Sequence, residues 1–145
     1  MNRRMASSSS AEEPKSRSAI LVVDDDPDVL MFIVSTLRRH GYTVFGAQGG
    51  REAVSVLMQQ KHLIGVVLTD VVMPSLNGPE LAARLVAVSP DLTVLYMSGY
   101  KEEHLARFGP LLNNCSVLSK PFTPKELLGA IYHCMGGPAS KSAGS

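Results

Sequence analysis

Short apolar runs alternate with helix-like patterns along most of this chain, and the alternation limits the folds open to it. Runs typical of strands, several of them rich in β-branched residues, are found at Ala19–Val23, Thr43–Phe45, Ile64–Thr69, Thr93–Met97 and Ser116–Leu118. Parallel neighbours need crossover connections, and helices usually supply them. The order therefore predicts an α/β domain: a doubly wound, five-stranded parallel sheet with five flanking helices.

The intervals between the runs carry helix signatures. The first has apolar residues at the spacing of one helix face, with Asp26 as N-cap, Pro27 in the first turn and Gly41 past the end. The last opens at Thr123–Glu126, "TPKE", which has the form of a capping box. Further stripes lie at 53–58 and 81–88, and the stretch 101–112 predicts a short helix ended by glycine and proline.

Polar, low-complexity ends set the limits of the folded part. The first 18 residues are serine-rich and the last ten read "GGPASKSAGS", so we expect a disordered tail over 1–18, one folded domain over 19–135 and a flexible tail over 136–145. A chain of 145 residues with such ends has room for one module only.

Charge and hydropathy exclude several classes of function. A formal net charge of +1 without a basic cluster argues against nucleic-acid binding by this chain. No apolar run approaches the roughly 20 residues of a membrane-spanning helix, so membrane insertion is not expected. Cys115 and Cys134 lie outside any metal-ligand or Cys-x-x-Cys spacing, so we expect reduced thiols in a cytoplasmic protein.

Polar residues follow several of the predicted strands. Asp24 and Asp25 follow the first, Asp70 the third, Ser98 the fourth and Lys120 the fifth. In open α/β sheets the ligand site lies outside the carboxyl ends of the strands, so these side chains should converge. Three carboxylates, a hydroxyl and an ammonium suit a divalent cation beside a phosphate-like anion, and hard oxygen ligands favour Mg2+.

The four motifs that carry these residues identify a resemblance. "ILVVDDDPD", "LTDVVMPSLNG", "VLYMSGY" and "SKPFTPKEL" occur in the order and spacing of the receiver domain of two-component response regulators, over about residues 19–135. The resemblance implies a flavodoxin-like fold, a phosphoacceptor and signalling role rather than that of a conventional enzyme, and a histidine kinase or histidine phosphotransfer protein as donor. "VLYMSGY" followed by "KPFTPKEL" is also similar to receivers attached to hybrid sensor kinases.

The resemblance also implies a role for each matched position. Asp70 is the expected phosphoacceptor, and Asp24 and Asp25 are the acid pair that holds Mg2+ together with Asp70 and the backbone carbonyl of Val72. Ser98 is the expected switch hydroxyl and Lys120 the phosphoryl-binding lysine. Pro121 is the candidate for a cis peptide bond with Lys120. The expected assembly is a monomer or a weak dimer linked to phosphorylation.

Physical chemistry gives the expected reaction independent support. Two anions must meet when Asp70 attacks a phosphoryl group, so a bound cation and Lys120 have to neutralise the approach. Movement of Ser98 toward the product would pull the loop after it and change the surface formed by the fourth and fifth units. The remaining acids, Asp26 and Asp28, have another use, because they can cap the first helix and face the positive end of its dipole.

Three positions depart from the usual receiver pattern. Many receivers have an aromatic residue three positions before the lysine, where this chain has Val117. Val72 and Tyr100 stand at positions that tune the lifetime of the acyl phosphate, and neither side chain offers a carboxylate or carboxamide to orient water. We therefore predict slow self-dephosphorylation.

Two other classes of function share part of this pattern. A haloacid-dehalogenase-like phosphatase also forms an aspartyl phosphate, but it needs a second carboxylate two residues after the nucleophile, where Val72 stands. A receiver-like binding module that works without phosphorylation is the alternative that the residues leave open.

Overall fold

The computed structural model describes residues 17–74, 76–100 and 102–137. The predicted tails fall almost wholly on residues 1–16 and 138–145, which lie outside the described residues. Helices and strands alternate along the described part in this order: β1 (Ala19–Val23), α2 (Pro27–Arg39), β2 (Val44–Ala47), α3 (Gly50–Gln60), β3 (Ile64–Asp70), α4 (Gly78–Val88), β4 (Thr93–Ser98), α5 (Glu102–Leu105), the 3-10 turn η2 (Ala106–Phe108), β5 (Asn114–Ser119) and α6 (Pro124–Cys134).

The five strands form one parallel sheet in the order β2-β1-β3-β4-β5. The chain passes from β1 outward to β2 and then back across β1 to β3, so the strand order switches between β1 and β3. In the register, Val23 of β1 lies opposite Ala47 of β2 and Thr69 of β3, which aligns their carboxyl ends. The predicted doubly wound sheet is confirmed, and its switch point lies beside Asp24 and Asp70.

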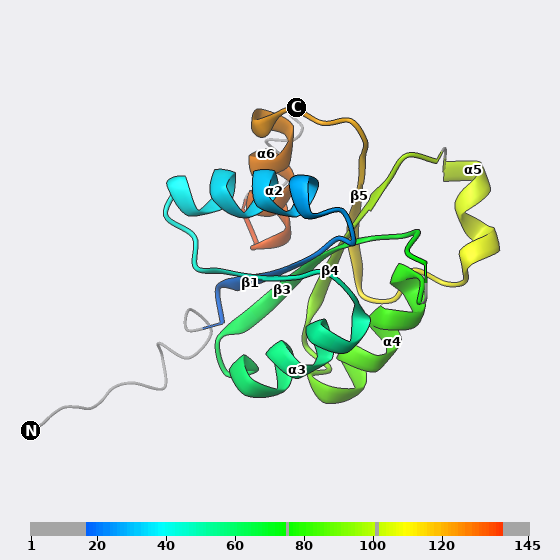
Figure 1. The fold of residues 1–145 in the computed structure, drawn as a ribbon, viewed down its shortest axis with the longest axis horizontal. Helices are drawn as coiled ribbons and strands as arrows, with labels where there is room; N and C mark the ends of the chain where they lie inside the picture. The colour runs from blue at the N-terminus through cyan, green and yellow to red at the C-terminus, as the bar shows by residue number, and fades with distance from the viewer. Residues whose placement is uncertain (1–16, 75, 101, 138–145) are drawn as a thin grey trace, which may run out of the picture.

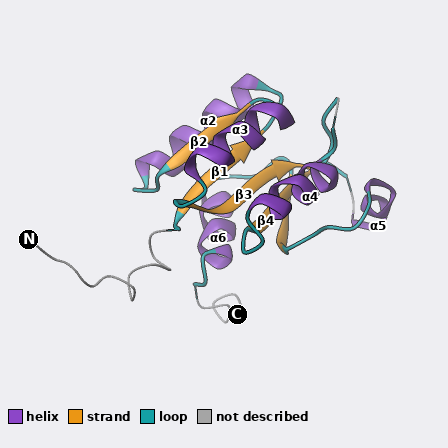
Figure 2. Ribbon diagram, turned by 90° about the horizontal axis from the view of Figure 1, so that it is seen from below, coloured by secondary structure: helices purple, strands orange, loops and turns teal. Residues whose placement is uncertain are grey.

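Helices cover both faces of the sheet (Figures 1 and 2). Side chains of β1 alternate between the faces: Leu21 packs in a core with α3 and α4, and Val22 packs in a core with α2 and α6. A smaller core joins Tyr96 of β4 to Leu105 of α5 near the β5 edge. The sheet is thus buried on both sides, which explains why its strands read as continuous apolar runs.

Helix N-termini follow the predicted capping. The carboxylate of Asp26 accepts the backbone N–H groups of Asp28 (2.9 Å) and Val29 (3.4 Å) at the start of α2. Thr123 and Glu126 form the predicted capping box of α6. Asn77 and Glu80 form a second box at α4. Caps of this kind satisfy N–H groups that have no partner within the helix.

The second strand begins one residue and ends two residues later than predicted. The pattern indicated Thr43–Phe45, whereas β2 covers Val44–Ala47. The strand continues through Gly46, which pairs with Val22 and lies where an added Cβ would come 3.4 Å from side-chain atoms of Leu30 and Val34. A glycine usually weakens a strand, but here it lets α2 pack closely on the sheet.

The prediction of reduced thiols is wrong for this structure, because Cys115 and Cys134 form a disulfide. Their separation of 19 residues gave no hint of it. Helix α6 runs back along β5 in the opposite direction and brings the two Cα atoms to 5.6 Å, inside the range that a disulfide spans.

Across the described ranges, no helix has both the length and the apolar character needed to cross a bilayer.

Candidate functional site

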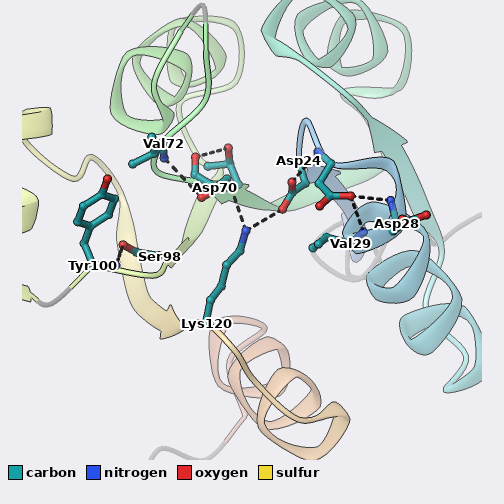
Figure 3. Close-up of polar contacts among 10 residues, drawn as sticks. Asp24, Asp28, Val29, Asp70, Val72, Ser98, Tyr100 and Lys120 are labelled. Atoms are coloured by element: carbon teal, nitrogen blue, oxygen red, sulfur yellow. Dashed lines mark hydrogen bonds and ion pairs between the residues drawn. The ribbon is translucent and has the colours of Figure 1, made fainter.

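The polar residues predicted at the strand ends lie at one rim of the sheet (Figure 3). Asp24 directly follows β1, Asp70 is the last residue of β3 and Ser98 is the last residue of β4. Lys120 comes one residue after β5. Parallel strands bring these positions together although they are spread over about two thirds of the sequence.

Lys120 joins the first and third strand ends. Its Nζ lies 2.9 Å from Oδ2 of Asp70 and 3.1 Å from Oδ2 of Asp24. The Lys120–Pro121 peptide bond is cis. One ammonium thus bridges two carboxylates that would otherwise repel each other in a poorly hydrated place.

Burial and charge compete at these groups. Asp24 is fully buried and Asp70 is 9% exposed. Desolvation raises the pKa of Asp70 and outweighs the lowering by the hydrogen bond and charge of Lys120. For Lys120 the balance is reversed. Desolvation lowers its pKa, but the hydrogen bonds with Asp70 and Asp24 and the charges of these carboxylates raise it by more, so the net shift is upward. The site holds a firmly protonated lysine beside a carboxylate whose negative charge is incompletely compensated.

Asp24, Asp25 and Asp70, called here the carboxylate cluster, fit a divalent cation. One oxygen from each lies within 4.8 Å of the others. The exposed Asp25 opens the cluster to solvent, while the other two members are largely buried. Carboxylate oxygens are the ligands that Mg2+ and Ca2+ take, so the donor set suits a hard cation.

The loop after β3 holds Asp70 in place. The backbone N–H of Val72 donates to Oδ1 of Asp70 at 3.4 Å, which leaves Oδ2 to Lys120. Gly78 donates to the Val71 carbonyl at 2.7 Å and packs so closely that an added Cβ would come 2.5 Å from the carbonyl oxygen of Asp70. Only glycine fits this approach. The predicted use of the Val72 carbonyl as a metal ligand stays a prediction.

Ser98 is buried at the end of β4, and its hydroxyl oxygen accepts the backbone N–H of Tyr100 at 2.9 Å (Figure 3). The Tyr100 ring lies against that of Phe108, with centroids 5.6 Å apart. Val117, at the position where many receivers carry an aromatic residue, is partly buried beside the core of Tyr96 and Leu105. The aromatic contact of this region therefore lies on the loop after β4 and not on β5.

The four aspartates of "DDDPD" divide into two groups. Asp24 and Asp25 belong to the carboxylate cluster. Asp26 caps α2, and Asp28 lies in the first helical turn, where a negative charge faces the positive end of the helix dipole. Oδ1 of Asp24 also accepts the N–H of Asp26 at 2.9 Å, so one short turn orients both groups.

Sequence reasoning missed three relationships at this site. It assigned Lys120 to the phosphoryl group alone and did not foresee its bond to Asp24. It gave no role to Gly78, although the motif "LTDVVMPSLNG" contained it. It also overlooked Phe108, because an aromatic residue in an irregular stretch carries no periodic signal.

Comparison with known proteins gives the family. The model of the response regulator receiver domain matches residues 20–132. The response regulator receiver protein CpdR of Brucella abortus is 34% identical over 106 residues, which are 73% of this chain and 87% of CpdR. The sensor kinase CckA of the same organism is 37% identical over 94 residues, which are 65% of this chain but only 10% of the kinase.

Solved structures agree with these matches. A receiver domain protein from Clostridium thermocellum has a TM-score of 0.74 at 26% identity, covering 88% of this chain and 99% of that one. The chemotaxis protein CheY4 of Vibrio cholerae has a TM-score of 0.73 at 28% identity, covering 81% and 98%. With the flavodoxin-like sheet and the clustered rim residues, these matches give one conclusion: the chain belongs to the family of response regulator receiver domains of two-component systems.

Proposed function

We propose that this receiver domain accepts a phosphoryl group on Asp70 from a phosphohistidine and transmits the change through the surface around β4, α5 and β5. The observation that carries the proposal is the position of Lys120 Nζ, 2.9 Å from the Asp70 carboxylate, inside a cluster that can also hold a cation. A carboxylate flanked by two sources of positive charge is suited to attack an anion.

The reaction exchanges one bond to phosphorus for another. A carboxylate oxygen of Asp70 forms the new P–O bond, and the P–N bond to the donor imidazole breaks with its electron pair left on nitrogen. Lys120 keeps its proton and moves its hydrogen bonds onto the phosphoryl oxygens, where an ammonium is most useful. The product is an acyl phosphate on Asp70.

Asp24, Asp25 and Asp70 would hold Mg2+, with the Val72 carbonyl as a further ligand. Mg2+ bound there supplies positive charge that offsets the repulsion between the carboxylate and the incoming phosphoryl group. The chain's own contribution is orientation: the N–H of Val72 and the close packing of Gly78 fix the Asp70 carboxylate before any donor arrives.

Ser98 and Tyr100 would carry the change outward. Ser98 follows Met97, which pairs with Asp70 across β3 and β4, and its hydroxyl oxygen accepts the N–H of Tyr100. Rotation of Ser98 toward a phosphoryl oxygen, to which its O–H would donate, would stretch that bond or draw the loop inward with it. Because the Tyr100 ring contacts Phe108 in η2, the movement would extend to the segment between β4 and β5.

An apolar hollow beside the site suits the helix of a histidine-bearing donor. It has a volume of about 450 Å³ and is lined by Val29, Phe32, Lys120, Pro121 and Phe122. The rings of Phe32 and Phe122 lie 6.5 Å apart, and Phe32 is 39% exposed. A histidine kinase or histidine phosphotransfer protein that covers this hollow would present its imidazole close to Asp70.

The location and the assembly of the domain are part of the same proposal. We propose a cytoplasmic module that works as a monomer or as a weak dimer linked to phosphorylation, without contact to nucleic acid or insertion into a membrane. Its similarity extends both to a receiver protein of comparable length and to a small part of a sensor kinase.

The proposal is tested with the full chain, Mg2+ and acetyl phosphate as donor, followed by intact mass and by amide spectra with beryllofluoride. We expect one added phosphoryl group in the unmodified chain and none in Asp70→Asn. Asp91→Asn, which removes an exposed carboxylate at the opposite end of the sheet, is the matched control and should be phosphorylated normally. Phosphorylation of the Asp70→Asn variant would contradict the assignment. Absence of both phosphoryl uptake and beryllofluoride shifts in the unmodified chain would favour the phosphorylation-independent binding module.

A further inference from the structure

We propose that Cys115 and Cys134 form a reversible redox site that ties the last turn of α6 to β5. The site lies at the end of the sheet opposite to Lys120 and uses none of the residues assigned to phosphoryl transfer. The inference therefore stands or falls independently of the proposed function.

The two cysteines close a ring around the phosphoryl-binding loop. Cys115 is the second residue of β5, and Cys134 is the last residue of α6. The chain between them runs along β5, turns through Lys120, Pro121 and Phe122, and returns along α6 (Figure 1). A single bond thus joins the far ends of two elements whose near ends carry Lys120 and the apolar hollow.

The sequence of α6 extends its apolar stripe to the disulfide. Leu127, Ile131 and Cys134 are spaced at four and then three residues, so they lie on one helix face. The first two are fully buried, whereas Cys134 and Cys115 are only partly buried at the border of the same core. When the disulfide opens, Leu127 and Ile131 still hold α6 in the core, and only the last turn of the helix loses its covalent link to β5.

The two cysteines differ in their surroundings. Cys134 borders a surface hollow of about 560 Å³, lined also by Arg17, Gly65, Asp91 and Thr93, whereas Cys115 does not line it. Thiol–disulfide exchange needs a thiolate to approach one sulfur directly, so access decides which bond forms first. The geometry points to Cys134 as the sulfur that a reductant attacks.

The chemistry is exchange with a dithiol reductant. Its thiolate attacks Sγ of Cys134, the Cys115–Cys134 bond breaks, and Cys115 leaves as a thiolate that takes up a proton. The second thiol of the reductant then attacks the mixed disulfide and releases Cys134 as a thiol. Two electrons and two protons pass to the protein, and the reductant ends as a disulfide. A small disulfide such as oxidised glutathione reverses the sequence.

A thiol count tests whether the site exists and is reversible. The full chain, purified without reductant, is unfolded in denaturant, alkylated with iodoacetamide and weighed. We expect no alkyl groups before treatment with dithiothreitol, two after it, and none again once the native protein has been reoxidised with glutathione disulfide. Two alkyl groups in the untreated chain, or failure to regain the unlabelled form, would overturn the proposal.

Single variants test the assignment of the attacked sulfur. Cys115→Ser leaves Cys134 as a thiol beside the hollow, and Cys134→Ser leaves Cys115 on the strand. Native alkylation should be roughly several-fold faster for the former than for the latter, because the hollow admits the reagent. Equal rates, or a faster reaction at Cys115, would show that Cys134 is not the point of entry.

Unfolding and hydrogen exchange test the tie itself. Opening a crosslink of about 20 residues should lower Tm by about 10 °C in a domain of this size. Amide exchange should rise mainly from Ile131 to Gly137, while the amides around Asp70 keep their protection. The Cys115→Ser/Cys134→Ser variant should have the Tm of the reduced chain, and dithiothreitol should not change it. An unchanged Tm and unchanged exchange on reduction would contradict a structural role for the disulfide.

Discussion

Ser98 accepts the backbone N–H of Tyr100 at 2.9 Å, so the hydroxyl at the end of β4 is engaged with its own loop before any phosphoryl group is present. The loop continues to Phe108 through the contact between the two aromatic rings. The position of this hydroxyl is thus coupled to a surface segment through one hydrogen bond and one ring contact.

Replacing Ser98 should separate phosphorylation from its structural consequence. In Ser98→Ala, Asp70, Lys120 and the carboxylate cluster are unchanged, so beryllofluoride should still bind. The amide shifts between Gly99 and Phe108 should shrink, because no hydroxyl remains to move toward the bound group. Amide spectra with and without beryllofluoride measure both effects.

Ser55→Ala is the control for this substitution, because Ser55 is exposed on α3. It should retain the full pattern of shifts. Shifts of unmodified size between Gly99 and Phe108 in Ser98→Ala would contradict the coupling.

Asp70→Asn should stabilise the metal-free fold near neutral pH. Desolvation raises the pKa of Asp70 above the ordinary value of 3.8, so the folded state binds its proton more firmly than the unfolded state. Stability is therefore lost as pH rises from the unfolded pKa through the raised folded pKa, and the loss persists at neutral pH. Asparagine carries no charge at any of these pH values, so the variant does not suffer this loss of stability.

Thermal unfolding without Mg2+ measures this effect. Asp70→Asn should have the higher Tm at about pH 7, and the difference should vanish at about pH 3, where the carboxyl group is protonated in both states. A lower Tm for the variant at neutral pH would mean that the bond to Lys120 outweighs desolvation. Asp91→Asn, at an exposed position, is the control.

The aspartates of the first loop should divide into one that binds metal and one that stabilises a helix. Asp26→Ala removes the cap of α2 and should lower the free energy of unfolding by about 1 kcal/mol. It should leave Mg2+ affinity nearly unchanged, because Asp26 lies outside the carboxylate cluster. Asp25→Asn should weaken Mg2+ binding at least about tenfold without loss of stability. Urea unfolding and calorimetric titration with Mg2+ separate the two effects, and a loss of both properties in either variant would contradict the division.

The sequence was most informative where the signal was periodic or local. The first strand was predicted to the residue, because a buried parallel strand is a continuous apolar run bounded by polar residues. The caps at Asp26 and Thr123 were equally readable, since a cap needs only residues within one helical turn. The end of β2 was not predicted, because a glycine at position 46 usually indicates the end of a strand. The close packing of α2 explains this glycine, and no local pattern shows that packing.

Contacts between distant elements were the part that no local pattern could give. The approach of strand ends predicted that Asp70 and Lys120 would be neighbours, but not that Asp24 would share the same ammonium. The disulfide between Cys115 and Cys134 was missed for the same reason, because the spacing of two cysteines says nothing about whether β5 and α6 place them side by side. Such relationships depend on packing distances, and these are properties of the assembled fold.

A water-orienting side chain at position 72 should shorten the lifetime of the acyl phosphate. Val72 is 36% exposed beside Asp70 and has no polar group to hold water for attack on phosphorus. Val72→Asn should accelerate hydrolysis about tenfold or more, since positioning of a reacting water is worth at least that much. Phosphoprotein gels over time measure the rate, with Val72→Ala as the control for size. A lifetime of seconds in the unmodified chain would contradict the prediction of slow hydrolysis.

Tyr96 should set part of the alkaline limit of the fold. Its hydroxyl donates to the Leu112 carbonyl at 3.1 Å, and burial raises its pKa from 10.0 to about 12. Because the unfolded state releases this proton first, the stability contributed by Tyr96 is complete below about pH 10 and is lost as pH rises toward 12. Tyr96→Phe loses the hydrogen bond, about 1 kcal/mol at neutral pH, but has no proton to lose. The difference in unfolding free energy between the two proteins should therefore narrow between these pH values. Urea unfolding at a series of alkaline pH values measures it, with Tyr100→Phe as the matched control, and a difference that stays constant would mean that Tyr96 ionises equally well in both states.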